Sequence, residues 1–343
     1  MAATRPGTPP VSSSGSRTGP DAGGSGTETW TARISVSSVP ETPDREHQAA
    51  HIAPNGEYLV YLSYPKGRTT YSEQPWAAEL HLIRTDGSND RVIIPEARAY
   101  GQSRAVVWLS DTQFVYIGGD GRTYRYDLAT GQSTVLVQEP PRDKPGWLLD
   151  PTLRFAVWGY PASVFVYDPE RKQVSLRQEL GGCEIYFAAG RWAVWMDDAG
   201  GPIGKVDLLT GQEGHILQKH DPRLPEGRGY MYFPMVSRQG DLLAFGASPD
   251  QHDHMSADYD IFVIRTDPTT LEPIGRAVRY TFHPATDRFP DVYTYTAALG
   301  MHAGEAPLTV ELSLEGDDWV WDLGDGTTER GSRVRHTYTR PGE

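Results

Sequence analysis

The sequence predicts an all-β protein, built from a β-propeller and a second, smaller β module. Two observations lead to this fold class. Short strand-like segments recur through the middle of the chain at a nearly constant period, and the 343 residues include 36 glycines and 27 prolines. A chain with so many glycines and prolines forms many turns and few long helices. Strands joined by short turns are therefore expected to make up the core.

The repeated unit pairs an aromatic-rich strand with a second strand that ends in an aspartate turn. The first strands are residues 58–61, 114–116, 155–158, 192–195 and 242–245. The turn aspartates are Asp86, Asp127, Asp168, Asp207 and Asp267, at spacings of 41, 41, 39 and 60 residues. A period of about 40 residues with four short strands per unit is typical of propeller blades. We interpret the aspartates as turn formers that bind their own backbone, not as catalytic acids.

Two segments carry a resemblance to a known family. Residues 51–61, His-Ile-Ala-Pro-Asn-Gly-Glu-Tyr-Leu-Val-Tyr, and residues 259–267, Tyr-Asp-Ile-Phe-Val-Ile-Arg-Thr-Asp, resemble repeats of the TolB-like β-propellers. The resemblance implies a propeller over residues 30–295, with six blades expected and five to seven left open. Residues 30–39 alternate like an edge strand that closes the ring, and a sixth blade is expected from residue 287. A sandwich would not explain the even spacing of the aspartates.

The second module is indicated by several elements in order. Residues 319–326 read Trp-Val-Trp-Asp-Leu-Gly-Asp-Gly, followed by His336-Thr-Tyr338 and Pro341-Gly342. This pattern resembles a polycystic-kidney-disease (PKD) domain, an immunoglobulin-like sandwich, over residues 296–343. In that family two further strands follow the Pro-Gly pair, so we expect an incomplete domain and a chain that is a fragment. Asp322 and Asp325 are expected to serve the hairpin structurally.

Composition limits the partners. The net charge of −13 argues against nucleic acid, which needs a basic surface. No apolar run is long enough to span a bilayer, and the single cysteine, Cys183, excludes a disulfide framework. We expect a monomer that binds a carbohydrate or a protein.

The first 29 residues are expected to form a disordered lead-in, because 20 of them are Gly, Pro, Ser or Thr. They contain no apolar stretch of the kind that a secretory signal requires. The two modules that the chain resembles occur in exported or cell-surface proteins. The resemblance therefore implies an extracellular, periplasmic or cell-surface location, although no signal peptide is visible in this chain.

Loop lengths indicate where a site would lie. Between the second and third strands, the first and fifth blades carry insertions at the same structural position, and hence on the same face of the propeller. The segment after the fourth blade opens on that face as well. The ligand-binding residues predicted from these loops are Arg68, Tyr71, Trp76, His220 and Asp258.

Histidines in the fifth-blade insertion suggest a metal site. His252 and His254 are two residues apart, so in an extended loop both rings lie on one side. With His283, or with Asp258, they could hold a divalent metal such as Mn, Ca or Zn. The alternative, which we favour, is a polar loop whose side chains cap its own backbone, because only two convergent ligands are visible.

Two functions of different classes follow. The first is a binding protein that uses one propeller face, with the PKD module as a spacer. The second is a polysaccharide lyase acting on uronic-acid polymers. That chemistry needs a cation against the uronate carboxylate and a base for the neighbouring proton. The residues predicted for it are Tyr259 as base and Arg228 or Arg288 as the carboxylate clamp. The tryptophans in strands are expected to pack between blades rather than to form a sugar platform.

Overall fold

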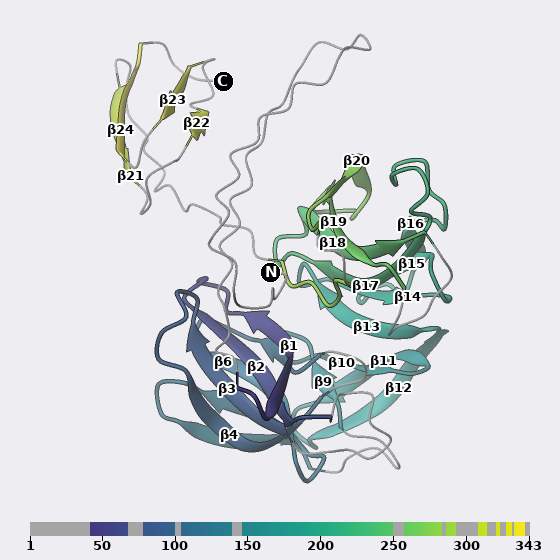
Figure 1. Ribbon diagram of the computed structural model, residues 1–343. Helices are drawn as coiled ribbons and strands as arrows, with labels where there is room; N and C mark the ends of the chain where they lie inside the picture. The colour runs from purple at the N-terminus through teal and green to yellow at the C-terminus, as the bar shows by residue number, and fades with distance from the viewer. Residues whose placement is uncertain are drawn as a thin grey trace. The chain divides into compact units, whose positions relative to one another are not determined.

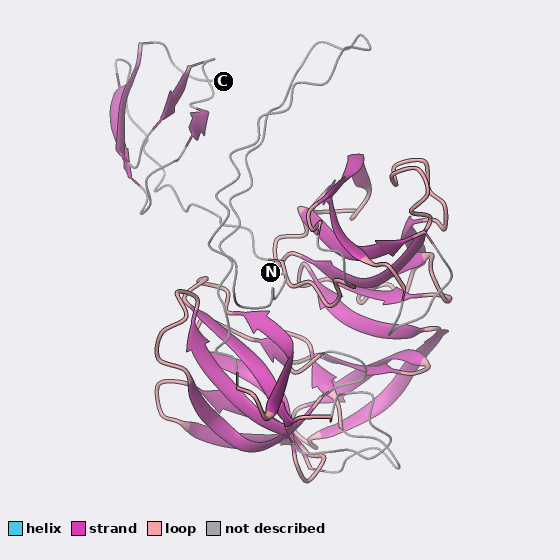
Figure 2. Ribbon diagram, in the orientation of Figure 1, coloured by secondary structure: helices cyan, strands magenta, loops and turns pink. Residues whose placement is uncertain are grey.

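The chain divides into two compact units, Met1–Thr294 and Tyr295–Glu343. The computed structural model describes residues 42–67, 78–99, 104–138, 146–249, 257–282 and 286–292 of the first unit. In the second unit it describes residues 308–313, 320–322, 327–330 and 333–339. All regular elements among these residues are strands, and none of the described residues forms a helix that could span a bilayer (Figure 2).

The described strands of the first unit form five antiparallel blades. Blade 1 contains β1 (Arg45–Ile52), β2 (Tyr58–Pro65), β3 (Ala78–Arg84) and β4 (Arg91–Arg98); blade 2 contains β5 (Val106–Trp108), β6 (Gln113–Gly118), β7 (Thr123–Asp127) and β8 (Gln132–Val137). Blade 3 contains β9 (Leu148–Leu149), β10 (Phe155–Gly159), β11 (Ala162–Asp168) and β12 (Gln173–Gly181); blade 4 contains β13 (Cys183–Ala188), β14 (Trp192–Met196), β15 (Ile203–Asp207) and β16 (Glu213–Leu217). Blade 5 contains β17 (Tyr230–Val236), β18 (Leu242–Ser248), β19 (Asp260–Thr266) and β20 (Pro273–Arg279).

The blades follow one another around a common centre in chain order, from the purple β1 to the green β20 (Figure 1). Apolar side chains are buried between successive blades, where one cluster joins blades 1 and 2, a second joins blades 2, 3 and 4, and a third joins blades 4 and 5. Trp108, Trp147, Trp158 and Trp195 lie in these clusters and are at most 8% exposed, and the half-buried Trp192 packs against the cluster of blades 4 and 5. The prediction that strand tryptophans pack between blades is confirmed.

The five repeat aspartates close the outer hairpins. Asp127 Oδ1 accepts hydrogen bonds from the amides of Ala129 and Thr130, and Asp207 Oδ1 accepts from those of Leu209 and Thr210. The equivalent aspartates of the other three blades bind their own turns in the same way. These carboxylates are therefore the turn formers that the sequence predicts.

A short segment, residues 286–292, joins the last blade to the first. The Asp287 amide donates to the Tyr259 carbonyl at 2.7 Å, and the Phe289 ring packs edge-on against Phe233 of blade 5. At the other end, the Ile52 amide of blade 1 donates to Asp291 Oδ2 at 2.7 Å. The number of blades in the whole chain stays a prediction, because residues 30–39 and 293–300 lie outside the described residues.

The second unit contains two strand pairs. β21 (Leu308–Ser313) pairs antiparallel with β24 (Arg333–Tyr338), and β22 (Val320–Asp322) pairs with β23 (Thr328–Arg330). The Trp-Asp-Leu-Gly-Asp-Gly motif thus begins on the first strand of a hairpin, as expected for a structural element. Its last four residues, 323–326, lie outside the described residues.

Close packing inside blade 4 leads to a stability prediction. A Cβ at Gly204 would lie 2.6 Å from the ring of Trp195, which is 1% exposed, whereas one at Gly214 would come no closer than 3.4 Å to any atom, the Lys205 side chain. We expect Gly204→Ala to destabilise the propeller by about 2 kcal/mol, because a buried indole must move. The matched Gly214→Ala should change stability by less than about 0.5 kcal/mol. Chemical denaturation followed by tryptophan fluorescence measures both, and equal midpoints would contradict the packing.

Candidate functional site

Six of the predicted site residues cannot be placed. They lie outside the described residues, and they are Arg68, Tyr71, Trp76, His252, His254 and His283. Among the described residues no group of three His, Cys, Asp or Glu side chains could hold a metal ion. The metal site therefore stays a prediction that concerns the fifth-blade insertion.

The remaining predicted residues include a charged cluster on the predicted face. Arg228, in the loop before β17, donates through Nη2 to Asp258 Oδ2 at 2.9 Å and lies 2.9 Å from Asp260 Oδ2. Arg279 reaches the other oxygen of Asp260 at 2.7 Å, and Asp260 itself is completely buried. Two cations therefore flank one buried carboxylate. This arrangement holds the loop after blade 4 against the start of β19.

The contacts of Arg228 bear on its predicted role. Its side chain is 17% exposed, and the guanidinium also donates to the Asp258 carbonyl. Because its donors are used within the protein, Arg228 positions the two loops and is poorly suited to hold a substrate carboxylate. The proximity of Arg228 and Asp258 does agree with the expectation that the loop after blade 4 and the insertion of blade 5 share one face.

A groove lies beside this cluster. Its volume is about 370 Å³, and its walls are formed by His220, Asp221, Pro222, Leu224, Pro225, Glu226, Gly227, Gly229, Pro249 and Arg276. The exposed Arg276 side chain comes from β20 and has no hydrogen-bond or ion-pair partner among the described residues. The groove thus offers one unpaired cation next to an exposed imidazole.

Local backbone geometry explains the shape of this loop. The His220 amide donates to the Gly229 carbonyl at 3.0 Å, which closes the segment, and the His220 ring packs edge-on against Tyr230. A Cβ at Gly229 would lie 1.8 Å from His220 Nδ1, so a larger residue there would displace the His220 ring. The Ala277 amide donates to the Arg223 carbonyl at 3.0 Å, which fastens the loop to β20.

Two predicted catalytic residues occupy other surroundings. Tyr259 is completely buried and packs against Phe233 and Tyr232 in the core between blades 4 and 5. A base must reach its substrate, so this placement does not suit the role predicted for Tyr259. Arg288 is half-buried in residues 286–292, with its guanidinium 5.5 Å from the Phe289 ring.

A second polar site, not predicted from the sequence, lies along the propeller axis. The innermost strands of blades 1, 4 and 5 each contain a β-bulge with a residue at positive φ: Ala49 (φ 55°), Glu184 (φ 57°) and Phe233 (φ 56°). Bulges redirect the side chains that follow them. Two residues after each bulge lie His51, Tyr186 and Met235, and all three line one pocket at the axis. The pattern of strand residues gives no signal for a bulge, and for this reason the site was missed.

Side chains at the axis bind the backbones of other blades. The Ala105 amide of blade 2 donates to His51 Nε2 of blade 1 at 3.2 Å. Arg104 donates to the Pro234 carbonyl of blade 5 at 2.7 Å, and the Phe233 amide donates to Glu184 of blade 4 at 3.2 Å. His51, Arg104 and Glu184 are 2%, 3% and 6% exposed. These three buried side chains connect four of the five blades.

Burial controls the charges of this axial network. It lowers the pKa of His51 to about 3, with a smaller contribution from the positive charge of Arg104. His51 is therefore neutral at pH 7, and its 3.8 Å approach to Asp291 is not an ion pair. Burial raises the pKa of Glu184 to about 8, although the charge of Arg104 acts in the opposite direction. Burial likewise raises the pKa of Asp291.

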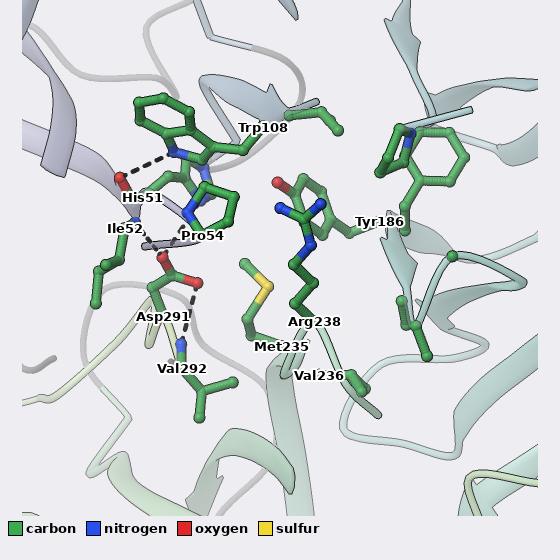
Figure 3. Close-up of a pocket in the computed structure, with 16 residues that line it drawn as sticks. His51, Ile52, Pro54, Trp108, Tyr186, Met235, Val236, Arg238, Asp291 and Val292 are labelled. Carbon is green, nitrogen blue, oxygen red and sulfur yellow. Dashed lines mark hydrogen bonds and ion pairs between the residues drawn. The ribbon is translucent and has the colours of Figure 1, made fainter. Parts of the chain in front are cut away.

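The pocket at the axis is shown in Figure 3. Its volume is about 100 Å³, and its walls come from all five blades and from residues 286–292. Besides His51, Tyr186, Met235 and Asp291, the residues that line it are Ile52, Pro54, Val107, Trp108, Pro151, Phe187, Ala188, Ala189, Gly190, Val236, Arg238 and Val292. The rim is formed by the turns between the first and second strands of the blades. In an antiparallel blade these turns lie at the end opposite to the loops that form the groove.

Comparisons with known proteins agree with the two-module interpretation. Residues 292–343 match the PKD domain family. No curated protein matches the chain. The solved structures that it resembles include TolB from Acinetobacter baumannii, with 16% identity, a TM-score of 0.46, and 67% of this chain and 54% of that chain covered.

Two further similar structures are oligogalacturonate lyases. One, in complex with manganese, has 14% identity, a TM-score of 0.42, and 69% of this chain and 67% of that chain covered. The other, from Vibrio parahaemolyticus, has 12% identity, a TM-score of 0.41, and 68% and 66% covered. The chain thus spans about half the length of TolB from Acinetobacter baumannii. Because the scores are low, the propeller assignment depends on the blades described above.

The raised pKa of Glu184 predicts a pH-dependent stability. In the unfolded chain Glu184 loses its proton near pH 4.5, but in the folded protein near pH 8. Folding therefore becomes less favourable as the pH rises through this window. Glu184→Gln removes this titration, so its stability relative to the natural protein should increase by roughly 2–4 kcal/mol between pH 5 and pH 8.5.

Urea denaturation across that pH range measures this difference, and titration of His51 cancels because both proteins contain it. The exposed Glu179 of β12 provides the control, since Glu179→Gln should run parallel to the natural protein. Parallel curves for Glu184→Gln as well would contradict the assignment.

Proposed function

We propose that this protein is a binding protein that holds a glycan or a protein on the face of the propeller that contains the groove. The observation that carries the proposal is the groove of about 370 Å³, with the unpaired Arg276 beside His220. A guanidinium without a partner favours a ligand with carboxylates, either a uronic-acid glycan or an acidic protein segment. The net charge of −13 disfavours polyanionic ligands in general, so the local charge of Arg276 has to provide the attraction.

The PKD match supports a role as spacer for the second unit. On that basis we propose that the protein acts outside the cytoplasm, in the periplasm, at the cell surface or in the extracellular space. In such a protein the propeller binds the ligand in its groove, and the PKD unit serves as a spacer. No unusual pKa is needed for this function, and no covalent step.

The second candidate is a lyase that acts on uronic-acid polymers. The same unpaired Arg276 would favour such a substrate, but two roles that the chemistry needs are not filled by the residues first predicted for them. Tyr259 is buried in the core, and Arg228 is bound by Asp258. A lyase would therefore have to use the histidines at 252, 254 and 283. Binding is the function that the described residues support better.

The groove can be tested by titrating uronic-acid oligosaccharides and acidic peptides into the full chain by calorimetry. We expect Arg276→Gln to weaken binding about tenfold, because one charge-assisted hydrogen bond contributes about 1.5 kcal/mol. Arg171 lies in the turn between β11 and β12, at the opposite end of its blade, and is 79% exposed, so Arg171→Gln should bind like the natural protein. Binding that is unchanged by Arg276→Gln would contradict the proposal.

Near-ultraviolet absorbance, recorded on the same mixtures, distinguishes binding from elimination. A rise that a chelator abolishes, and that is lost in His252→Ala/His254→Ala, would establish a metal-dependent lyase instead. A flat trace together with measurable affinity is the result that the binding proposal requires.

A further inference from the structure

The pocket at the axis has a chemistry of its own, separate from that of the groove. Its walls are mainly apolar, and they include Met235, Val236 and Trp108, which are 3%, 5% and 7% exposed. An apolar cavity of about 150 Å³ is large enough to bind benzene. At about 100 Å³, this pocket accommodates a smaller group, such as a branched aliphatic chain of four or five carbons.

The rim contains an unpaired cation. Arg238 lies in the turn between β17 and β18, and Figure 3 shows its guanidinium reaching toward Tyr186 and the centre of the pocket. Its side chain is exposed, and it has no hydrogen-bond or ion-pair partner among the described residues. A guanidinium with free donors at the edge of an apolar pocket favours a carboxylate on the ligand.

The side chains at the inner end of the pocket determine the orientation of such a ligand. Asp291 lies there, and its two carboxylate oxygens accept hydrogen bonds from the Ile52 and Val292 amides. His51 is neutral, with Nε2 occupied by the Ala105 amide. Asp291 and His51 Nε2 are thus engaged with backbone amides, whereas Arg238 at the rim has donors available for an acid group. The apolar part of the ligand would point inward, against Met235 and Trp108.

Other ligand charges fit less well. A cationic ligand would meet Arg238 at the entrance, and like charges disfavour binding. A phosphate ester needs several donors around its oxygens, whereas Arg238 is the one lysine or arginine among the residues that line this pocket. A monocarboxylate matches a single two-pronged guanidinium.

We propose that the axial pocket is a second binding site, which takes a branched aliphatic carboxylate with its acid group on Arg238 and its alkyl group between Met235, Val236 and Trp108. Two sources present this chemistry, a free branched-chain acid and the C-terminal residue of a peptide. The site lies at the end of the propeller opposite to the groove. It is therefore independent of the proposed glycan or protein binding there.

The test uses the full chain and five probes: isovalerate, isovaleramide, acetate, the tripeptide Gly-Gly-Val and its C-terminal amide. Ligand-observed NMR detects binding, and calorimetry measures affinity. We expect isovalerate to bind at least tenfold more tightly than acetate, because acetate leaves the pocket empty. Each acid should bind at least tenfold more tightly than its amide, since the amide lacks the charge that Arg238 recognises.

The two sources give different rank orders. If the tripeptide binds more tightly than isovalerate, the natural ligand is a chain terminus; the reverse order indicates a free acid. Either order supports the site. Equal binding of acids and amides, or no binding of any acid to the folded protein, would overturn it.

Variants separate this site from the groove. Arg238→Gln should weaken the binding of the acids at least tenfold and leave that of the amides unchanged, whereas Arg276→Gln should leave both unchanged. Conversely, Arg238→Gln should not alter the binding of the groove ligands. Since Arg238 is exposed, this substitution is not expected to disturb folding, and circular dichroism checks that it does not. Acid binding that is the same in Arg238→Gln and in the natural protein would refute the proposal.

Discussion

The structure depends on buried polar side chains that cross the propeller axis. Apolar packing connects each blade with the next one in the chain, and polar side chains at the axis connect blades that are not neighbours in the chain. Arg104 of blade 2 donates to the backbone of blade 5, and Glu184 accepts from that blade as well. A buried polar group without a partner is costly, so each of these bonds strongly favours one arrangement of the blades. His51 and Asp291 extend the same principle to blade 1.

Contacts within the protein also determine which charged side chains the two ends of the propeller offer to a ligand. At one end, the loop before β17 is fastened by Arg228 and Arg279 on the buried Asp260, which leaves Arg276 as the group available to a ligand. At the other end, the bulges turn His51, Tyr186 and Met235 toward the axis and leave Arg238 unpaired at the rim. Arg276 and Arg238 have no hydrogen-bond or ion-pair partner among the described residues and each lies at a cavity, so these two cations are informative about ligands.

Much of the fold could be predicted from the sequence, because its determinants are local. A turn-forming aspartate, such as Asp127 or Asp207, predicts a hairpin from the neighbouring residues alone. Loop lengths are also a local property of the sequence, and from them Arg228 and Asp258 were predicted to lie on one face. The axial site could not be found in this way. It depends on bulges at Ala49 and Glu184 that shift the register between strands, and on blades far apart in the sequence meeting at one point. The burial of Tyr259 could not be predicted either, because the sequence does not show whether an aromatic residue beside a loop faces the solvent or the core.

The central claim, that axial side chains join the blades into one scaffold, is most directly tested by hydrogen exchange. The amides of Ile52, Ala105 and Phe233 donate to Asp291, His51 and Glu184, respectively. If these bonds join the blades, the three amides should exchange only through global unfolding, with one common free energy of opening. Exchange of any of them as fast as that of amides in the outer hairpins would show that the axis opens locally, and would contradict the account.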